Sequence, residues 1–405
     1  MDILQILRRL QRIALFVFFF SINFEMWDPF NTDEAFSIAK LTGYLYLLLL
    51  LPRILVFLRV DHLTSLLLPI WIFFGYLTII SIININPVSK DFFNEPIFQN
   101  IILFWLLLNH EREDPDILEK GLLSFALGSV VLAVLFKLGI GIEYEWGRVT
   151  LFGANQNTIG TFMTVSMMIL VLSVFENKLN LGQIRFIFLL PVLIMLQLMI
   201  ETGSRVAFVS FIFAFIAGIY MYKTNKIANK VLIVTIGFIL FMAIWLYTMQ
   251  SDLMRQRLIE SINQGNSSRE YIWSRIINLI LENPVFGVGL TGYTEFAVYV
   301  FGQPTSAHNV ILQVLCYTGI VGLTLYLVFL WRVAMAGYIH YKHRGPLLQV
   351  LLLIPIFGLI LTHQVLATKI GWVIFSYSST SLIFDQYEED DLQEQVYEYK
   401  ESSNI

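Results

Sequence analysis

Long apolar runs recur along the whole chain, and they constrain its fold more than any other feature. A run of about 18 or more apolar residues is long enough to cross the hydrocarbon core of a bilayer, which is about 30 Å thick. Because lipid offers no partner to unpaired backbone groups, such runs must form helices or a closed barrel. Solid apolar blocks such as 45–51 lack the alternation of barrel strands. The sequence therefore predicts an all-α, polytopic membrane protein.

The composition agrees with this class. Of the 405 residues, 57% are hydrophobic and only 14% are charged, whereas a soluble globular domain carries about 25% charged residues. Cys316 is the only cysteine, which excludes a disulfide within the chain and a cysteine-rich metal site. No phosphate-binding P-loop or other nucleotide motif is present, and we expect no nucleic-acid partner.

Twelve membrane-spanning helices are expected from the apolar runs. An even number places both chain termini on one side of the membrane. The positive-inside rule makes that side the cytoplasm, because Arg8, Arg9, Arg12 and most other cations then lie inside. The expected spans lie near 13–26, 36–58, 63–83, 96–109, 118–138, 157–175, 185–200, 205–222, 231–249, 309–331, 347–364 and 368–384.

One long loop, on the outer side, divides the chain. We expect an N-terminal region of nine helices over 1–249, the loop over 250–308, three further helices over 309–384, and an acidic cytoplasmic tail over 385–405. Loops longer than about 12–15 residues are usually functional or disordered. This loop is rich enough in apolar residues to fold, and we expect it to carry short helices.

A short amphipathic helix is expected within this loop. Ser267 and Glu270 have the spacing of a capping box, which starts a helix, and Pro284 with the glycines that follow it would end the helix. One side at helical spacing holds Arg269, Trp273, Ile276, Ile277 and Ile280.

Four polar residues on the expected outer face are candidates for chemistry: Arg148, Arg205, Arg269 and His308. Arginine is permanently charged and can bond two phosphate oxygens at once, so three arginines at one face suit a diphosphate. A snorkelling contact with lipid phosphate is an equal alternative for any single arginine. His308 suits a general base near neutral pH, with a capped or buried histidine as the alternative.

No metal or other cofactor is expected. The outer-face histidines lack ligand spacing, and the acidic residues there are scattered. Without a nucleotide motif, the energy for a reaction would be stored in the substrate itself.

Several segments together resemble the signature domain of O-antigen ligases and polymerases. They are R-x-x-x-W at 269–273, N-P-V-F-G-V-G at 283–289, A-H-N at 307–309 and G-I-V-G at 319–322. Two upstream segments are also similar to the family's pattern, namely G-R-V-T-L-F-G-A-N-Q-N at 147–157 and T-G-S-R at 202–205.

The resemblance implies a glycosyltransferase of the GT-C type at the outer face of the bacterial inner membrane. Such an enzyme moves a glycan en bloc from undecaprenyl diphosphate to an acceptor hydroxyl without a metal ion or nucleotide sugar. It further implies that Arg205 and Arg269 neutralise the diphosphate and that His308 activates the acceptor.

The expected substrate-binding residues are Arg148, Asn157, Asn309 and Arg275, of which Asn309 also suits the cap of the tenth helix. The implied partners are the undecaprenyl-diphosphate-linked glycan, a glycolipid or glycan acceptor and membrane lipids, with envelope glycan-assembly proteins as candidates.

Two other activities compete with the ligase interpretation. A repeat-unit polymerase would use the same donor site with a second lipid-linked glycan as acceptor. A lipid-linked glycan transporter would be expected to show internal repeats and helices broken at the membrane midplane. The chain shows no repeat, and the candidate arginines gather at one face. A non-catalytic scaffold fits the outward-facing arginines less well.

Overall fold

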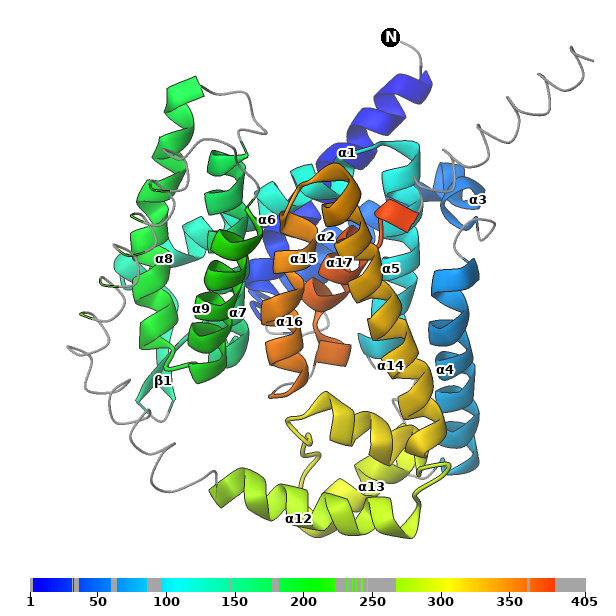
Figure 1. Cartoon of the computed structure of the whole chain (residues 1–405). Helices are drawn as coiled ribbons and strands as arrows, with labels where there is room; N and C mark the ends of the chain where they lie inside the picture. The colour runs from blue at the N-terminus through cyan, green and yellow to red at the C-terminus, as the bar shows by residue number, and fades with distance from the viewer. Residues whose placement is uncertain are drawn as a thin grey trace, which may run out of the picture.

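The structure is a computed structural model that describes residues 3–30, 32, 36–59, 64–85, 96–145, 147–176, 182–222, 231, 235, 238, 242, 246, 267–362 and 365–382. The described chain is mostly helical (Figure 1). The first set of helices consists of α1 Ile3–Ser21, α2 Ile38–Leu50, α3 Ile54–Phe57, α4 Thr64–Ile83, α5 Pro96–Glu113, α6 Ile117–Lys137, α7 Gln156–Phe175, α8 Leu190–Glu201 and α9 Arg205–Met221. The second set consists of α12 Ser267–Glu282, α13 Gly289–Phe301, α14 Val310–Arg344, α15 Leu348–Leu351, α16 Leu353–Ile360 and α17 Lys369–Ser378. Short 3-10 turns are η1 Ile22–Phe24, η2 Leu51–Arg53, η5 Gly182–Leu189 and η6 Val365–Ala367.

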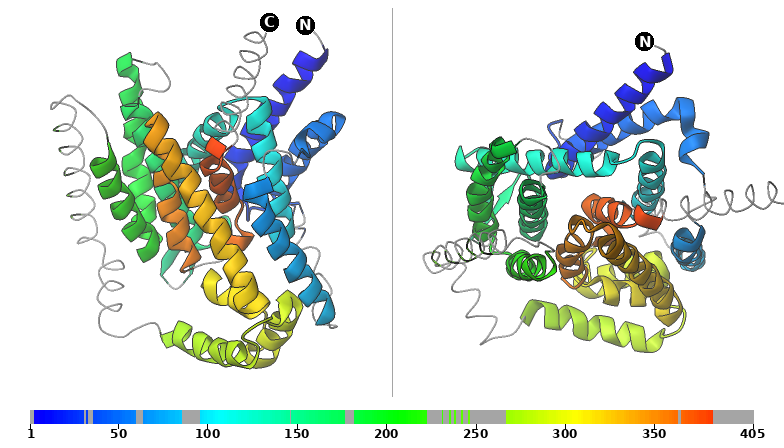
Figure 2. Two further views of the ribbon diagram at one scale, coloured as in Figure 1. Left: turned by 45° about the vertical axis from the view of Figure 1, so that its right-hand side comes forward. Right: turned by 45° about the horizontal axis from the view of Figure 1, so that its top comes forward.

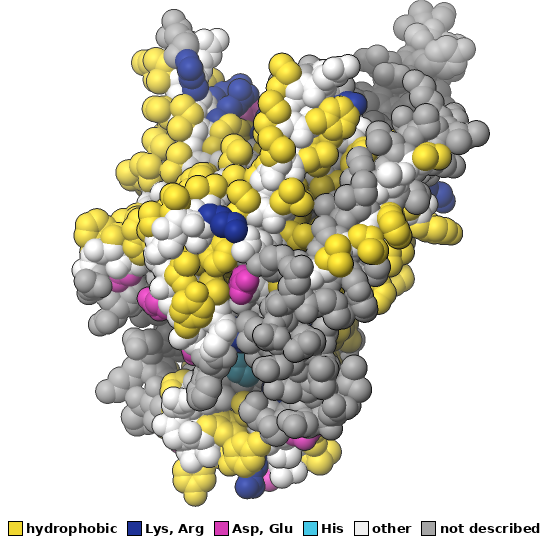
Figure 3. Space-filling view, turned by 90° about the vertical axis from the view of Figure 1, so that its left-hand side faces the viewer, with side chains coloured by type: hydrophobic (Ala, Val, Ile, Leu, Met, Phe, Trp, Pro, Cys, Tyr) yellow, Lys and Arg dark blue, Asp and Glu magenta, His cyan; other side chains and the backbone are white. Residues whose placement is uncertain are grey.

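Six helical segments of the described chain are long and apolar enough to cross a membrane, so the chain is a multi-pass membrane protein. Figure 3 shows hydrophobic side chains spread over much of one face of the molecule, as expected of a surface in contact with lipid. The total of twelve spans stays a prediction. The segments are Ile38–Phe57, Leu66–Ile83, Ile117–Lys137, Gln156–Phe175, Gly182–Glu201 and Val310–Arg344.

Three expected regions fall largely or wholly outside the described residues. They are most of the ninth span at 231–249, the first part of the long loop at 250–266, and the acidic tail at 385–405.

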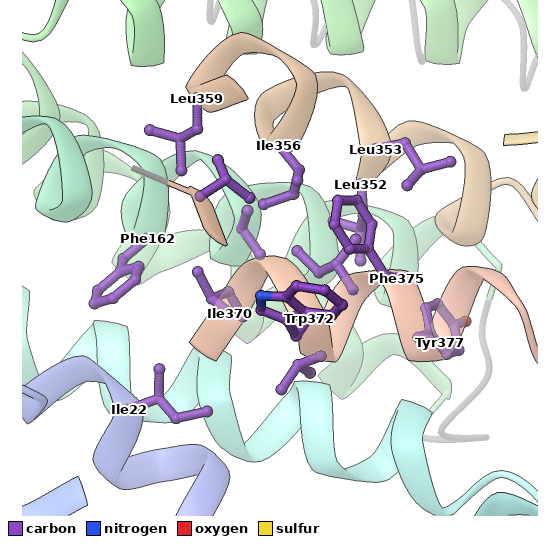
Figure 4. Close-up of a cluster of buried hydrophobic side chains, with 14 of the residues drawn as sticks. Ile22, Phe162, Leu352, Leu353, Ile356, Leu359, Ile370, Trp372, Phe375 and Tyr377 are labelled. Atoms are coloured by element: carbon purple, nitrogen blue, oxygen red, sulfur yellow. The ribbon is translucent and has the colours of Figure 1, made fainter. Parts of the chain in front are cut away.

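Helix α17 lies at the centre of the helical core. Its residues from Ile370 to Ser378 are all buried. Figure 4 shows Trp372 and Phe375 of α17 next to side chains of α16, among them Leu353 and Ile356. This helix is therefore enclosed by protein, which explains why a segment of only 10 residues can remain helical inside the fold.

The expectation of an all-helical chain is wrong at one place. Strands β1 (Ile142–Glu145) and β2 (Arg148–Leu151) form an antiparallel hairpin in which Glu145 pairs with Arg148. Gly147 lies in the turn with φ 73°, a value that tight hairpin turns require. Strands of four residues are too short to stand out in a hydropathy pattern that identifies long helices.

Helices α12 and α13 lie across one end of the helical bundle, opposite the N-terminus of α1 (Figures 1 and 2). The expected amphipathic helix is confirmed as α12, with Ile276 fully buried. Ile277 is an exception to the expected apolar side, because its side chain is 45% exposed. Helix α13 is a second short helix of the loop, whose position the sequence did not indicate, and it is tied to the end of α4: Ser81 accepts a hydrogen bond from the Leu290 N–H (2.9 Å).

Helix α14, expected as an uninterrupted span, is broken near its start. Gly319 has φ 59° and ψ −161°, a backbone conformation that is essentially restricted to glycine. Beyond the break, the N–H groups of Ile320 and Val321 donate to the carbonyl oxygens of Pro284 (3.0 Å) and Val285 (3.5 Å). The break therefore exposes backbone groups that the preceding loop satisfies.

The same loop also bonds to the other side of the break. The Val288 N–H donates to the Cys316 carbonyl oxygen at 2.9 Å. The backbones approach so closely that a Cβ on Gly319 would lie 2.2 Å from the Val285 oxygen, and one on Gly287 would lie 2.5 Å from the Thr318 nitrogen. The glycines of the two sequence motifs thus join the loop to the broken helix.

We predict that Gly319→Ala destabilises the protein by about 2–4 kcal/mol, because the new methyl group adds steric displacement to a strained backbone. The control is Gly302→Ala, where φ is also positive (77°) but a Cβ would meet nothing within 4 Å. We expect the control to lose only about 1–2 kcal/mol. Thermal unfolding in lipid nanodiscs measures both, and equal losses would show that backbone contact at Gly319 is unimportant.

Candidate active site

Arg148 connects the start of α7, which follows it closely in the sequence, to the distant start of α9. Its Nε donates to the Thr202 carbonyl oxygen at 2.7 Å, and its Nη2 donates to Asn157 Oδ1 at 3.3 Å. Arg148 lies on β2, Asn157 in the first turn of α7, and Thr202 just before α9. The structure therefore brings Arg148 and Asn157 together and uses both to hold the turn that precedes Arg205.

Arg205 begins α9, and the sequence before it forms the start of that helix. Gly203 has φ 61°, and the Ser204 hydroxyl accepts the Ala207 N–H at 3.4 Å as an N-terminal cap. Gly160 of α7 allows the close approach of α9, since a Cβ there would lie 2.9 Å from Ser204 Cβ. The positive end of a helix favours an anion, so the half-buried Arg205 adds a full charge to a partial one.

Helix α12 places Arg269 and attaches itself to the segment that carries His308. Trp273, one turn after Arg269, donates from Nε1 to the Ala307 carbonyl oxygen at 2.9 Å. The Nη2 of Arg269 reaches the Thr362 carbonyl oxygen, just beyond the end of α16, at 3.5 Å. Arg269 therefore contacts the segment that follows α16, while its helix is fixed to the residue before His308.

His308 has a strained backbone and a half-buried side chain. Its φ of 49° lies in the left-handed region, which is uncommon for residues other than glycine. Its N–H donates to the Ser306 hydroxyl at 3.1 Å. Burial lowers the pKa of His308 below its ordinary value, and the positive charge of Arg269 lowers it further. The imidazole is therefore neutral at pH 7, with one ring nitrogen able to accept a proton.

The packing of α16 on α9 brings Arg205 and Arg269 to the same end of the bundle. A Cβ on Gly358 of α16 would lie 3.1 Å from Val206 Cγ1, so α16 contacts the first turn of α9. Thr362, which Arg269 contacts, follows Gly358 by about one helical turn. Arg205 and Arg269 thus lie at the same end of α9 and α16, in the part of the structure where α12 crosses (Figure 1).

Two expected binding residues have other roles in the structure. Arg275 is exposed, and its guanidinium lies 5.6 Å from the centre of the Tyr271 ring. At 3.6 residues per turn, Arg275 lies about 240° further round α12 than Arg269. The structure therefore does not bring Arg275 to the side of the helix that carries Arg269. Asn309 is the cap of α14, because its Oδ1 accepts the Leu312 N–H at 3.1 Å.

Sequence reasoning missed the backbone acceptors that orient the arginines, namely the carbonyl groups of Thr202 and Thr362. No residue type marks them, because every residue has a carbonyl group. The spacing of Trp273 one turn after Arg269 did signal a shared face, although it did not reveal the bond to Ala307.

The arrangement suits an anionic group that gains charge during a reaction. Arg205 and Arg269 supply permanent positive charge, and neutral His308 supplies a base whose pKa responds to Arg269. Within the described ranges no three histidine, cysteine or acidic side chains group together as a metal site would require.

Comparison with protein families agrees with the geometry. Residues 190–327 match the family model described as O-antigen ligase, which confirms the family resemblance. The matched range begins with α8 and ends within α14, so it contains Arg205, Arg269 and His308. Arg148 and Asn157 precede it. A search of curated proteins found no match.

We predict that Arg269→Gln raises the pKa of His308, because it removes a nearby positive charge. The pKa should remain below the ordinary value of 6.5, since burial is the larger cause of the shift. Arg269→Lys, which retains the charge, is the matched control. NMR titration of isotope-labelled histidine measures the change. An unaltered pKa of His308 in Arg269→Gln would show that the charge of Arg269 does not act on His308.

Proposed function

We propose that this protein is an O-antigen ligase-type glycosyltransferase. It moves a glycan en bloc from undecaprenyl diphosphate to a hydroxyl group of the lipid A core or another surface acceptor. The family match supports glycan transfer of the ligase and polymerase type. The observation that carries the proposal is the grouping of Arg205, Arg269 and neutral His308 at one end of the bundle.

In the proposed reaction His308 accepts the proton of the acceptor hydroxyl. The acceptor oxygen attacks the anomeric carbon of the donor sugar, and the bond from that carbon to the diphosphate oxygen breaks. The electron pair leaves with the diphosphate, whose growing negative charge Arg205 and Arg269 stabilise. Attack from the face opposite the leaving group inverts the anomeric centre, and the step requires no added metal ion or nucleotide.

Each remaining residue has a supporting role in this scheme. Arg148 and Asn157 hold the turn before Arg205 through the Thr202 carbonyl group. Trp273 holds α12 against the residue before His308. These contacts keep the charges in place before the substrate arrives, which is how fixed groups lower a barrier without reorganising.

We further propose that the site faces the periplasm at the outer face of the inner membrane, with both termini in the cytoplasm. The N-terminus of α1, close to Arg8, Arg9 and Arg12, lies at the opposite end of the bundle from α12 (Figure 1). This separation agrees with the positive-inside rule.

A transfer assay with purified protein in lipid nanodiscs tests the proposal. It contains undecaprenyl-diphosphate glycan with or without a lipid A-core acceptor. Product that requires the acceptor would support a ligase, and a ladder of longer lipid-linked glycans without it would instead support a polymerase. Absence of both products from folded protein would contradict glycan transfer to these acceptors.

We predict that Arg205→Ala and His308→Ala each lower transfer by about 100- to 1000-fold, the usual cost of losing one group that stabilises a transition state. Arg269→Ala should lose a similar factor, whereas Arg275→Ala on the same helix should change the rate by less than about threefold. Thermal unfolding checks that each variant is folded. Near-normal transfer by a folded variant would remove that residue from the site.

The rate of transfer should also depend on the protonation of His308. Because burial and Arg269 lower its pKa, the neutral base persists as the solution becomes mildly acidic. We expect a single acidic limb in the pH–rate profile with its midpoint below 6.5, the ordinary value. The residual activity of His308→Ala should lack this limb, and a wild-type midpoint above 6.5 would argue against His308 as the base.

A further inference from the structure

A cavity of about 650 Å³, lined by both polar and apolar groups, lies apart from the contacts of Arg269 and His308. It is lined by the hairpin β1–β2, the residues after η1 and the starts of α2, α5, α7 and α17. Inside it, Lys369 forms an ion pair with Glu25, and both side chains are less than one-fifth exposed. Its volume falls within the range of about 300–1,000 Å³ that is typical of small-molecule sites.

The chemistry of the lining favours sugars over a phosphate group. Carboxylates of Glu25, Glu143 and Glu145 outnumber the ammonium groups of Lys40 and Lys369, which disfavours an anion. Amide and hydroxyl groups line the rest of the polar wall. Carboxylate, amide and hydroxyl groups together can donate to and accept from sugar hydroxyls.

An apolar groove of about 160 Å³, lined mainly by residues of α2 and α5, adjoins this cavity. Its walls include Leu47 and Ile102, whose side chains are 37% and 47% exposed. Lys40, Gln99 and Lys369 line both the groove and the cavity. The two spaces therefore meet at these residues, with apolar surface on one side and hydrogen-bonding groups on the other.

The cavity is also adjacent to Arg148, which supports the start of α9 in the candidate active site. Glu145 pairs with Arg148 across the hairpin, and Glu143 pairs with Thr150, so these side chains share one face. At the start of α7, the cap residue Asn155 and Thr158 line the cavity on either side of Asn157, which binds Arg148. The hairpin and the first turn of α7 therefore line the cavity and also carry Arg148 and Asn157.

We propose that the cavity and groove form one glycolipid-binding site, with the sugars in the cavity and the hydrocarbon chain in the groove. This site holds the acceptor, an assignment that rests on the proposed function. The donor diphosphate belongs with Arg205 and Arg269, because the carboxylates of the cavity repel an anion. An acyl-chain glycolipid and a polyprenyl-linked glycan share the required chemistry.

Photolabelling in nanodiscs tests the site with an alkyl maltoside that carries a diazirine in its alkyl chain. The His308→Ala variant is used, so that turnover does not affect occupancy. We expect labels on α2 and α5. Leu47→Trp should lower labelling by about tenfold, since displacing roughly two methylene groups from the groove costs that much affinity.

The matched control is Leu48→Trp, because Leu48 is 61% exposed and lies outside the groove. Dodecyl maltoside should compete with the probe, whereas dodecyl phosphocholine, which has the same chain without a sugar, should not. Equal labelling of the Leu47→Trp and Leu48→Trp variants, or equal competition by both detergents, would overturn the site.

Transfer kinetics test the acceptor role separately. Leu47→Trp should raise the KM for the acceptor by about tenfold while leaving the KM for the donor unchanged. An acyl-chain glycolipid and a polyprenyl-linked glycan are each tested as competitors of the photolabel. The one that competes identifies the natural occupant of the site, and competition by neither would overturn the acceptor role. An unchanged acceptor KM in an active Leu47→Trp enzyme would overturn that role and leave glycan transfer intact. If wild-type protein is labelled but transfers nothing, the proposed function and the acceptor role fail, and only the glycolipid site remains.

Discussion

The backbone pairing at the break in α14 is the constraint on which the described site depends. A helix in a membrane must satisfy its own N–H and carbonyl groups, and a break at Gly319 leaves some of them without helical partners. The loop around Pro284 and Val285 supplies those partners. Since this loop joins α12 to α13, its attachment to α14 fixes the position of both helices. His308 lies between α13 and α14, so its position follows from the same contacts.

Two groups of residues meet because α16 packs on α9. One group is assembled by Arg148, which holds the start of α9 through the Thr202 carbonyl group. The other is assembled by Trp273, which holds α12 against the residue before His308. The contact of Arg269 with Thr362 links the second group to α16 and so to the first. Burial of His308 and, to a lesser extent, the positive charge of Arg269 lower the pKa of the imidazole, which favours its neutral, proton-accepting form.

The molecule separates positive charge from hydroxyl-binding groups. Arginines and a helix start are suited to a diphosphate, while the cavity behind the hairpin is rich in carboxylates and is suited to sugars. The hairpin joins the two regions, since Arg148 and Glu145 are directly paired on it. A substrate with charge at one end and sugars at the other would find complementary surfaces on the two sides of this pair.

The sequence by itself determined the membrane class, the amphipathic helix α12 and the cap at Asn309. These features depend on hydropathy or on bonds within one helical turn, so they are written in neighbouring residues. Only the tertiary structure decided that Arg148 binds Thr202, that Arg269 reaches Thr362, that Arg275 points elsewhere and that α14 breaks at Gly319. Such contacts depend on how distant helices pack, and their acceptors are backbone carbonyl groups, which every residue carries and no residue type reveals.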